Sequence, residues 1–385
     1  MPSAGPLAGI RIVEMAGLGP APLAAQLLAD LGAEVICVDR AAGATGKACE
    51  AGAADPTEIS RRNKRSIALD LKKPEAAEAC RGLIARADVL IEGFRPGVME
   101  RLGFGPDDIC AAHPRLVYAR MTGWGQDGPW AGSAGHDINY ISLSGALNAV
   151  GRRGAPPVPP LNFVGDYGGG TMFLIFGILA ALIERQRSGR GQVVDAAMVD
   201  GVAATMPIFH MFHARGEWSA ERESNLLDGG APFYRCYETA DGKAMAVGPL
   251  EPQFYAEFCA RLGLPAEAQY HRSRWAEQGA RFAAAFRTRT RDEWAAIFEG
   301  SDACVSPVLT IAESEHAAQL KARGTLVRGA GDVLQAAPAP RFGRTPAPAI
   351  RPPRAPGADG ASILAELGYG ADRIEEMAKT GALRT

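Results

Sequence analysis

Residues 9–39 read GIRIVEMAGLGPAPLAAQLLADLGAEVICVD, and the pattern within them decides the fold. The β-branched run Gly9–Ala16 ends in a Gly/Pro loop at residues 17–22, and the Ala/Leu-rich segment Leu23–Leu31 follows. A second apolar run, Glu34–Asp39, comes directly after this segment. Short apolar runs bounded by turn residues are typical of buried strands. The stretch therefore predicts a strand, a tight turn, a helix and a second strand.

The same alternation continues toward the middle of the chain. The segments Ala87–Glu92 and Arg115–Met121 predict two more strands, with helical segments between them. A glycine run, Gly168–Gly170, is expected to form a turn that opens an apolar helix over Met172–Ile183, and Val193–Thr205 predicts a strand that leads into a helix. Alternating strands and helices indicate the α/β class, with a parallel sheet covered by helices.

The regular alternation is lost beyond residue 225. A strand is expected at Lys243–Val247 and helices at Glu251–Leu262 and Asp292–Phe298. Because 385 residues exceed what one hydrophobic core usually fills, we interpret residues 225–313 as a smaller inserted domain.

Charge and cysteine content limit the class of partner. The 41 basic and 43 acidic residues form no long block of either sign, so neither nucleic acid nor a membrane is expected as a partner. The seven cysteines lack CxxC spacing, which favours reduced thiols in a cytoplasmic protein and predicts no metal site. We expect no secretory signal, and the longest apolar run is shorter than the roughly 18 residues that span a bilayer. These features favour a small-molecule substrate.

The opening unit fits a dinucleotide-binding site only in part. Gly17 and Gly19 follow the first strand, and Asp39 ends the next one, where a ribose ligand would lie. Pro22 stands where the third glycine is needed, and Pro20 removes a backbone N–H donor for the pyrophosphate. An ordinary helix that begins at a proline is therefore favoured.

The segment GHDINY, residues 135–140, places His136 beside Asp137 at the start of a predicted helix. The dipole at a helix N-terminus favours a neutral imidazole, which can accept a proton, and stabilises an anion. On these residues alone, a capping Asp137 beside a surface His136 is an equal alternative.

A second acid lies in GDYGGG, where Asp166 precedes Tyr167 and three glycines. Three consecutive glycines are costly in folding entropy, so they indicate that a ligand or another backbone approaches closely. An N-cap role for Asp166 is the alternative. Glu251 opens a predicted helix before Pro252, either as a functional acid or as a first-turn residue that the dipole favours.

Basic residues suited to phosphates are the third candidate group. Several lie at predicted carboxyl ends of strands, the edge at which open α/β sheets bind ligands. A phosphorylated carrier such as coenzyme A requires such a distributed cationic surface, and solvated surface charge is the alternative. The group consists of Arg40, the segment Arg61–Arg65, Lys72, Lys73 and Arg95.

Longer stretches of the chain resemble the family III CoA-transferase group, and within it the α-methylacyl-CoA racemases. The segments that carry the resemblance include DLGAEVICVDR, NKRSIALDLK, ADVLIEGFRPGVMERLG, RLVYARMTGWGQDGP, AGHDINYISLSG, PPLNFVGDYGGG and AVGPLEPQFY. The resemblance implies an interlocked homodimer in which each chain has a large Rossmann-like domain and a small α+β domain. The implied division is a large domain at 1–195, a linker at 196–224, the small domain at 225–313, a linker at 314–336 and a return to the large domain at 337–385, which begins with a Pro-rich strap.

Carried over residue by residue, the resemblance implies that His136 and Asp166 are an acid/base pair. Glu251, supplied by the partner chain of the dimer, is expected to assist the histidine. Coenzyme A is expected as part of the substrate, without a separate cofactor, and the stretch Ala41–Ser60 is longer and richer in Ala and Gly than the family pattern. The residues implied for the CoA nucleotide are Arg40, Leu69, Asp70, Leu71, Lys72 and Arg95, and those around the thioester are Gly135, Asp137, Ile138, Asn139 and Tyr140.

The implied activity is racemisation of 2-methylacyl-CoA thioesters, in which a proton leaves the α-carbon on one face and returns on the other through an enolate. Backbone N–H groups at the Asp137 helix start or at Gly168–Gly170 are candidate donors to the enolate oxygen. Ile138, Tyr140 and Phe233 are candidates for the acyl-chain site.

Two other activities are open. The first is transfer of CoA between carboxylic acids through an anhydride of Asp166. His136 favours racemisation, because the transferases of the group usually carry a different residue there. The second is CoA binding without catalysis, against which the presence of both residues counts.

Overall fold

The computed structural model describes residues 5–41 and 54–384. The chain forms two compact units. Unit 1 comprises residues 1–144, 161–205 and 324–385, and unit 2 comprises residues 145–160 and 206–323. The sequence-based division instead begins the small domain at residue 225 and ends it at residue 313.

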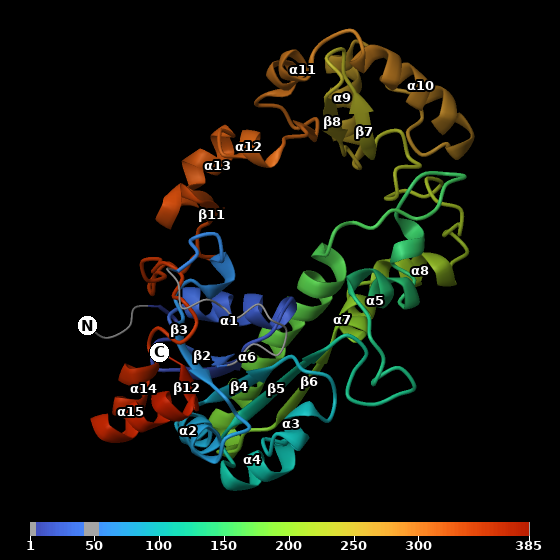
Figure 1. The fold of residues 1–385 in the computed structure, drawn as a ribbon. Helices are drawn as coiled ribbons and strands as arrows, with labels where there is room; N and C mark the ends of the chain where they lie inside the picture. Colours follow the sequence, from blue (N-terminus) through green and yellow to red (C-terminus); the bar gives the residue numbers. More distant parts are fainter. Residues whose placement is uncertain (1–4, 42–53, 385) are drawn as a thin grey trace. The chain divides into compact units, whose positions relative to one another are not determined.

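Unit 1 is built on a seven-stranded sheet in the order β12-β3-β2-β1-β4-β5-β6 (Figure 1). Strands β1 to β6 pair in parallel, and their order is that of the Rossmann fold, which places a topological switch point between β1 and β4. The parallel strands are β1 (Arg11–Met15), β2 (Glu34–Arg40), β3 (Arg65–Leu69), β4 (Val89–Glu92), β5 (Val117–Thr122) and β6 (Val193–Ala197). The prediction of a parallel sheet is wrong at one edge, where β12 (Leu383–Arg384) pairs antiparallel with β3.

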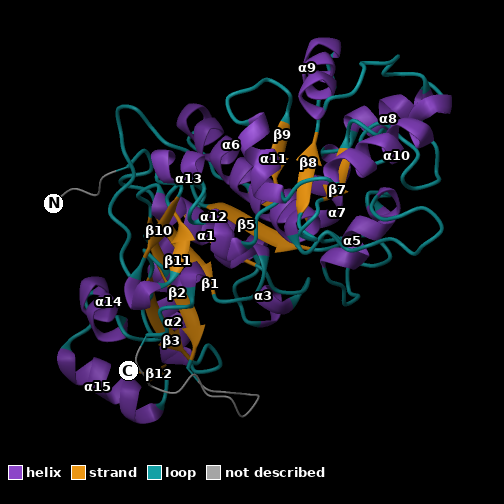
Figure 2. Ribbon diagram, turned by 90° about the horizontal axis from the view of Figure 1, so that it is seen from above, coloured by secondary structure: helices purple, strands orange, loops and turns teal. Residues whose placement is uncertain are grey.

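Helices cover both faces of this sheet (Figure 2). Successive strand residues point to opposite faces, so Ile12 belongs to one hydrophobic core and Val13 to the other. One core is closed by α1 (Pro20–Asp30) and α6 (Met172–Ser188), and the other by α2 (Pro74–Ala85), α3 (Val98–Arg101), α4 (Pro106–Ala112), α14 (Gly360–Leu367) and α15 (Ala371–Thr380).

The charged residues of the basic segment Arg61–Arg65 are all paired inside unit 1, and their suitability for phosphates remains a prediction. Arg62 is 2% exposed, and its guanidinium donates to both carboxylate oxygens of Asp30, at 3.0 and 2.5 Å. It also donates to Gln335 Oε1 at 2.6 Å, in the hairpin of β10 (Leu326–Arg328) and β11 (Leu334–Ala336). Removing one partner of a buried ion pair is costly, so this contact fixes the hairpin against α1. The other pairs are Arg61 with Asp39, Lys64 with Glu14 and Arg65 with Glu366.

Unit 2 contains an antiparallel sheet in the order β7-β8-β9 and an aromatic core. In that core Tyr237 stacks on Phe286 with ring centroids 5.2 Å apart, and Phe258 meets Phe282 edge-on at 5.0 Å. The elements of unit 2 are α8 (Pro207–Ala214), β7 (Arg235–Glu238), β8 (Ala244–Val247), α9 (Pro252–Leu262), α10 (Trp275–Phe286), α11 (Arg291–Phe298), β9 (Val305–Pro307), α12 (Ile311–Ser314) and α13 (Ala318–Arg323).

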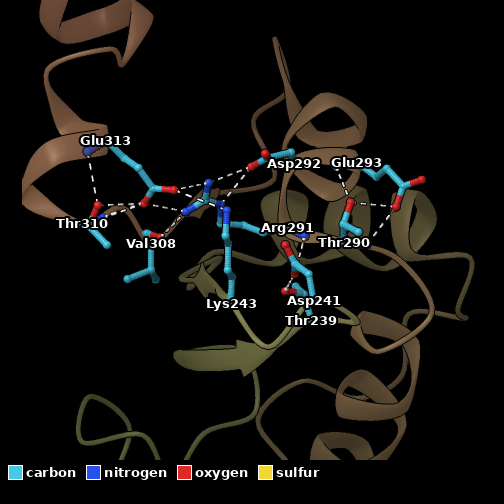
Figure 3. Close-up of polar contacts among 10 residues, drawn as sticks. All are labelled: Thr239, Asp241, Lys243, Thr290, Arg291, Asp292, Glu293, Val308, Thr310 and Glu313. Atoms are coloured by element: carbon cyan, nitrogen blue, oxygen red, sulfur yellow. Dashed lines mark hydrogen bonds and ion pairs between the residues drawn. The ribbon is translucent and has the colours of Figure 1, made fainter.

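A charged cluster joins α11 to α12 within unit 2 (Figure 3). The guanidinium of Arg291 donates to both carboxylate oxygens of Glu313 at 2.9 Å and to the Val308 carbonyl at 3.1 Å. Lys243 Nζ lies 3.4 Å from the same carboxylate. The hydrogen bonds from Arg291, followed by those from Thr310, hold the pKa of Glu313 well below its ordinary value.

We expect Glu313→Gln to lower the melting temperature of the protein at neutral pH. Because the pKa of Glu313 is depressed in the folded state, its stabilisation is complete above the ordinary value of 4.5 and is lost as the pH falls below it. The difference from wild type, followed by circular dichroism, should therefore shrink in acid. Glu238→Gln is the control, because Glu238 and Arg287 form only an exposed pair at 3.9 Å. A melting difference that is independent of pH would contradict this assignment.

Candidate active site

A cavity of about 420 Å³ lies at the carboxyl ends of β1, β4 and β5. This is the edge, beside the switch point, at which sheets of this topology bind ligands. Residues at or after the ends of these strands form most of its wall, and His136, Tyr140, Asp166 and Met198 also line it. The wall residues from the strand ends are Leu18, Gly19 and Pro20 after β1, Gly93, Phe94, Arg95 and Pro96 after β4, and Met121, Thr122, Gly123, Trp124, Ala131, Ser133, Ala134 and Gly135 at the end of β5 and in the loop after it.

A larger cavity, of about 810 Å³, lies at the opposite edge, beside the amino ends of β1 to β4. Its charged side chains are engaged with one another: Arg11 and Arg65 both pair with Glu34. Arg86 donates to the carbonyl of Glu366. No histidine is among its described lining residues, so the smaller cavity is the candidate active site.

His136 is the N-cap residue of α5 (Asp137–Leu143), so the alternative in which Asp137 caps this helix is wrong. The Asn139 side chain accepts a hydrogen bond of 3.0 Å from the His136 backbone N–H. The first N–H groups of a helix have no partner within it, so those of Asp137 and Ile138 are available at the helix start. Tyr140, one turn into α5, donates its hydroxyl hydrogen to the Gly135 carbonyl.

Asp166 lies inside a helix, so the predicted turn at Gly168–Gly170 is wrong. Residues Phe163–Thr171 form a π-helical segment, η3, that continues directly into α6. The glycines are needed because η3 packs against α7 (Met198–Ala204): a Cβ at Gly201 would lie 2.0 Å from the Gly169 carbonyl oxygen. The sequence indicates that a ligand or another backbone approaches the glycine run closely. In the structure it is a backbone, that of α7.

The two helix starts are joined by the side chain of Asp137. Its Oδ2 accepts hydrogen bonds of 2.7 Å from the backbone N–H groups of Gly165 and Asp166. Two N–H groups in the first turn of η3, those of Gly165 and Asp166, are therefore occupied, and Gly169 and Gly170 are buried against neighbouring backbone and side chains. Of the two expected donors to an enolate oxygen, the α5 start remains and the glycine run does not.

The carboxyl group of Asp166 is in an environment that favours its neutral form. Burial raises its pKa, the hydrogen bond of 3.2 Å from Asn162 lowers it, the nearby Asp137 raises it and His136 lowers it, with a net increase. The pKa of Tyr140 is raised by burial and then by Asp166. A carboxyl group with a raised pKa beside an imidazole in a cavity is typical of acid/base sites.

The comparison with known proteins identifies the family. A profile described as CoA-transferase family III matches residues 7–360. The chain belongs to CoA-transferase family III. It is 44% identical to the alpha-methylacyl-CoA racemase of Mus musculus and 43% identical to that of Homo sapiens, with 96% of each chain covered in both cases. A CAIB/BAIF family structure from Brucella suis has a TM-score of 0.79 at 27% identity and covers 94% of this chain and 100% of its own.

These matches confirm the predicted family and α/β fold, and the structure brings several predicted site residues together. Arg95, Gly135 and Tyr140 line the same cavity as His136 and Asp166. Among the other residues implied for the thioester site, Asp137 is buried, whereas Ile138 and Asn139 are exposed and outside the lining of the cavity.

The residues that the family resemblance assigns to the CoA nucleotide lie at the same edge of the sheet. Arg40 is the exposed last residue of β2, and Leu69 is the last residue of β3. Leu69 is 1% exposed, so only its backbone can reach a ligand. Asp70, Leu71 and Lys72 follow it, and their roles remain predictions. Of the atypical stretch 41–60, residues 42–53 lie outside the described residues.

Two predicted residues lie in unit 2. Glu251 is the exposed N-cap residue of α9, and its assistance to His136 remains a prediction. Phe233 is fully buried in the aromatic core of unit 2, so its expected place in an acyl-chain site is wrong. Within the described residues, no group of three or more His, Cys, Asp or Glu side chains is placed to hold a metal ion.

The sequence prediction missed the aromatic wall of the cavity. Trp124 meets Tyr140 edge-on with ring centroids 4.7 Å apart, and Trp130 meets Trp124 at 4.8 Å. Tyr140 also packs so closely that a Cβ at Gly123 would lie 2.0 Å from its ring. The sequence feature that could have predicted these aromatic contacts is the presence of Trp124 and Trp130 in the Gly-rich loop before His136.

We expect Gly201→Ala to lower the free energy of unfolding by roughly 1–3 kcal/mol, as in other overpacked positions, because the new Cβ meets the Gly169 carbonyl. Urea denaturation followed by circular dichroism measures this change. Gly343→Ala is the control, because no described heavy atom lies within 4 Å of the Cβ position there. Equal stability of the two variants would show that η3 and α7 are not in close contact.

Proposed function

We propose that this chain is an α-methylacyl-CoA racemase that interconverts the (R) and (S) forms of 2-methylacyl-CoA thioesters. The observation that carries the proposal is the placement of His136 and Asp166 in the wall of one cavity at the ligand-binding edge of the sheet. The identity of 43–44% to two racemases over nearly the full chain supports the same reaction.

Racemisation requires two groups that exchange a proton with opposite faces of the α-carbon. In one direction the imidazole of His136 takes the proton and the protonated carboxyl of Asp166 returns one, and in the other direction the roles are reversed. The raised pKa of Asp166 serves this exchange, because it lets the carboxyl hold a proton closer to neutral pH. A single proton shared by the pair is then sufficient for both directions.

The thioester oxygen gains negative charge when the α-proton leaves. In this proposal the free N–H groups at the start of α5 donate to that oxygen, where the helix dipole also favours negative charge. A donor of this kind contributes about 3–4 kcal/mol to lowering the barrier in other enzymes. Arg95 in the cavity wall, with Arg40 and Lys72 at neighbouring strand ends, is proposed to bind the CoA phosphates.

The alternative within the family is CoA transfer, in which the carboxylate of Asp166 attacks the thioester carbonyl. His136 has no evident use in anhydride formation, whereas racemisation requires a second acid/base group beside Asp166. The presence of His136 in the same cavity wall therefore favours proton transfer.

Incubation with one enantiomer of a 2-methylacyl-CoA in D₂O separates the two reactions. Deuterium at the α-carbon together with loss of optical purity supports racemisation.

His136→Ala should reduce the exchange rate about 10²- to 10⁴-fold, which is the usual contribution of an acid/base group. The control is His113→Ala, because His113 lies in the wall of neither cavity described above. Absence of exchange, with CoA passing to an added carboxylate, would establish the transferase instead.

We also propose that the enzyme is a homodimer, interlocked as in the family resemblance, in which Glu251 of one chain assists the site of the other. Exposed apolar side chains on α6 support a partner: Met172 is 47%, Phe176 70% and Ile183 62% exposed. Within the described residues, Phe163–Ser188 is one helical stretch long and apolar enough, by length and composition, to cross a membrane, and 39% of its most apolar window is buried. We propose that a partner chain packs against these exposed apolar side chains of α6.

Light scattering should give twice the chain mass of 40.5 kDa. Phe176→Glu should weaken the dimer at least about tenfold, because a charge would enter an apolar contact. Arg187→Glu, at the polar end of the same helix, is the control. A dimer unchanged by Phe176→Glu would place the contact elsewhere, and sedimentation of the wild-type chain with liposomes would favour a membrane as the cover.

We propose further that the enzyme is cytoplasmic and uses no resident cofactor, with coenzyme A entering only as part of the substrate. The chemistry assigned to His136, Asp166 and the α5 start transfers protons only. It therefore requires no electron carrier.

A further inference from the structure

We propose that Asp137 is a positioning residue that holds Asp166 in a fixed place relative to His136 and keeps a negative charge beside the Asp166 carboxyl group. The inference rests on the proposed function, because it assigns a role within that acid/base pair. It differs from the family-derived expectation, in which Asp137 only borders the thioester.

The geometry of Asp137 supports the positioning role. One carboxylate oxygen, Oδ2, accepts hydrogen bonds from two consecutive backbone N–H groups, those of Gly165 and Asp166, both at 2.7 Å. Hydrogen bonds to an ionised acceptor are shorter and stronger than neutral ones. Because His136 directly precedes Asp137, a single side chain connects the backbone of one proposed acid/base residue to that of the other.

The contact leaves little room for adjustment. Asp137 is 7% exposed, and a Cβ at residue 165 would lie 2.6 Å from its Oδ2. Only glycine can therefore occupy position 165 while the carboxylate keeps both hydrogen bonds. A displacement of the order of 1 Å in an active site can reduce the rate about 10²-fold, so a contact this close can control the reaction.

The second carboxylate oxygen indicates that the charge itself has a use. Oδ1 of Asp137 is buried and has no hydrogen-bond partner within the described residues. An unpaired buried oxygen on an ionised group is costly. An asparagine of the same shape would offer one oxygen to both N–H groups without this charge, so holding the two helix starts together does not by itself require a carboxylate.

The charge acts on Asp166. The groups near the Asp166 carboxyl group are His136 and Asp137 at the start of α5, Tyr140 further along the same helix, Asn162 before η3, and Arg95 in the wall of the same cavity. After burial, Asp137 is the group that raises the pKa of Asp166, against the hydrogen bond from Asn162 and the charge of His136. Asp137 thereby favours the form in which His136 and Asp166 share one proton.

Two substitutions separate position from charge. Asp137→Asn keeps an oxygen of the same reach and removes the charge, whereas Asp137→Glu keeps the charge and, for lack of space beside residue 165, displaces it. Asp107→Asn, an exposed first-turn acid of α4, is the control for the general effect of a carboxylate on a helix dipole. The measurement is the pH profile of kcat/KM for α-proton exchange, with melting temperatures to show that each variant is folded.

For Asp137→Asn we expect the acid limb of the profile to move to lower pH, because loss of the neighbouring anion lowers the pKa at which the pair takes up its second proton. For Asp137→Glu we expect kcat to fall about 10²-fold, with an acid limb close to that of wild type. Asp107→Asn should follow the wild-type profile. A purely structural role for Asp137 would lower the melting temperature in both variants and leave the acid limb of Asp137→Asn unchanged, and that result would overturn the proposal.

The wild-type measurement keeps this inference separate from the proposed function. If the wild-type chain exchanges the α-proton and Asp137→Asn has an unshifted acid limb, the inference fails and the racemase remains. If the wild-type chain transfers CoA without exchange, the racemase fails. The same variants then test the role of Asp137 on the transfer rate, because Asp166 is the nucleophile of that reaction.

Discussion

The packing of η3 against α7 is the constraint on which the rest of the site depends. The Gly169 carbonyl lies where a side chain at residue 201 would be, so the two backbones meet directly. This contact sets the position of the helix that carries Asp166. It also brings the start of η3 to the carboxylate of Asp137, and from there to His136. The acid/base geometry is therefore determined by glycine positions that carry no chemistry of their own.

The fold was predictable from local patterns, and the exceptions have physical causes. Strands such as β4 and β5 were visible as apolar runs, and α5 was placed correctly by the residues that precede it. Strand β12 has two residues, too few to produce a periodic pattern, and it pairs with β3 through a contact that no local signal encodes. The glycine run was interpreted as a turn before the apolar helix because glycine is the usual residue of tight turns, whereas here it allows two helices to touch.

The charged residues of the site illustrate a second limit of sequence interpretation. The family resemblance paired His136 with Asp166, and the structure places both in the wall of one cavity, but composition cannot show which basic side chains face that cavity. Arg62 and Lys64 have the same local character as Arg95, yet the first two are buried against Asp30 and Glu14 and only Arg95 faces the cavity. Pairing of this kind depends on carboxylates about 30 to 50 residues away in the chain. Only the folded structure reveals which basic residues remain for a substrate.

The order of synthesis has a consequence for strand β3, because its antiparallel partner β12 is made much later. Strand β3 leaves the ribosome more than 300 residues before β12. At about 5–20 residues per second, its outer edge stays unpaired for on the order of 15–60 s. An open strand edge is a template for pairing with other chains. During this interval the outer edge of β3 is therefore exposed to misassociation, until β12 pairs with Ala68 and Leu69.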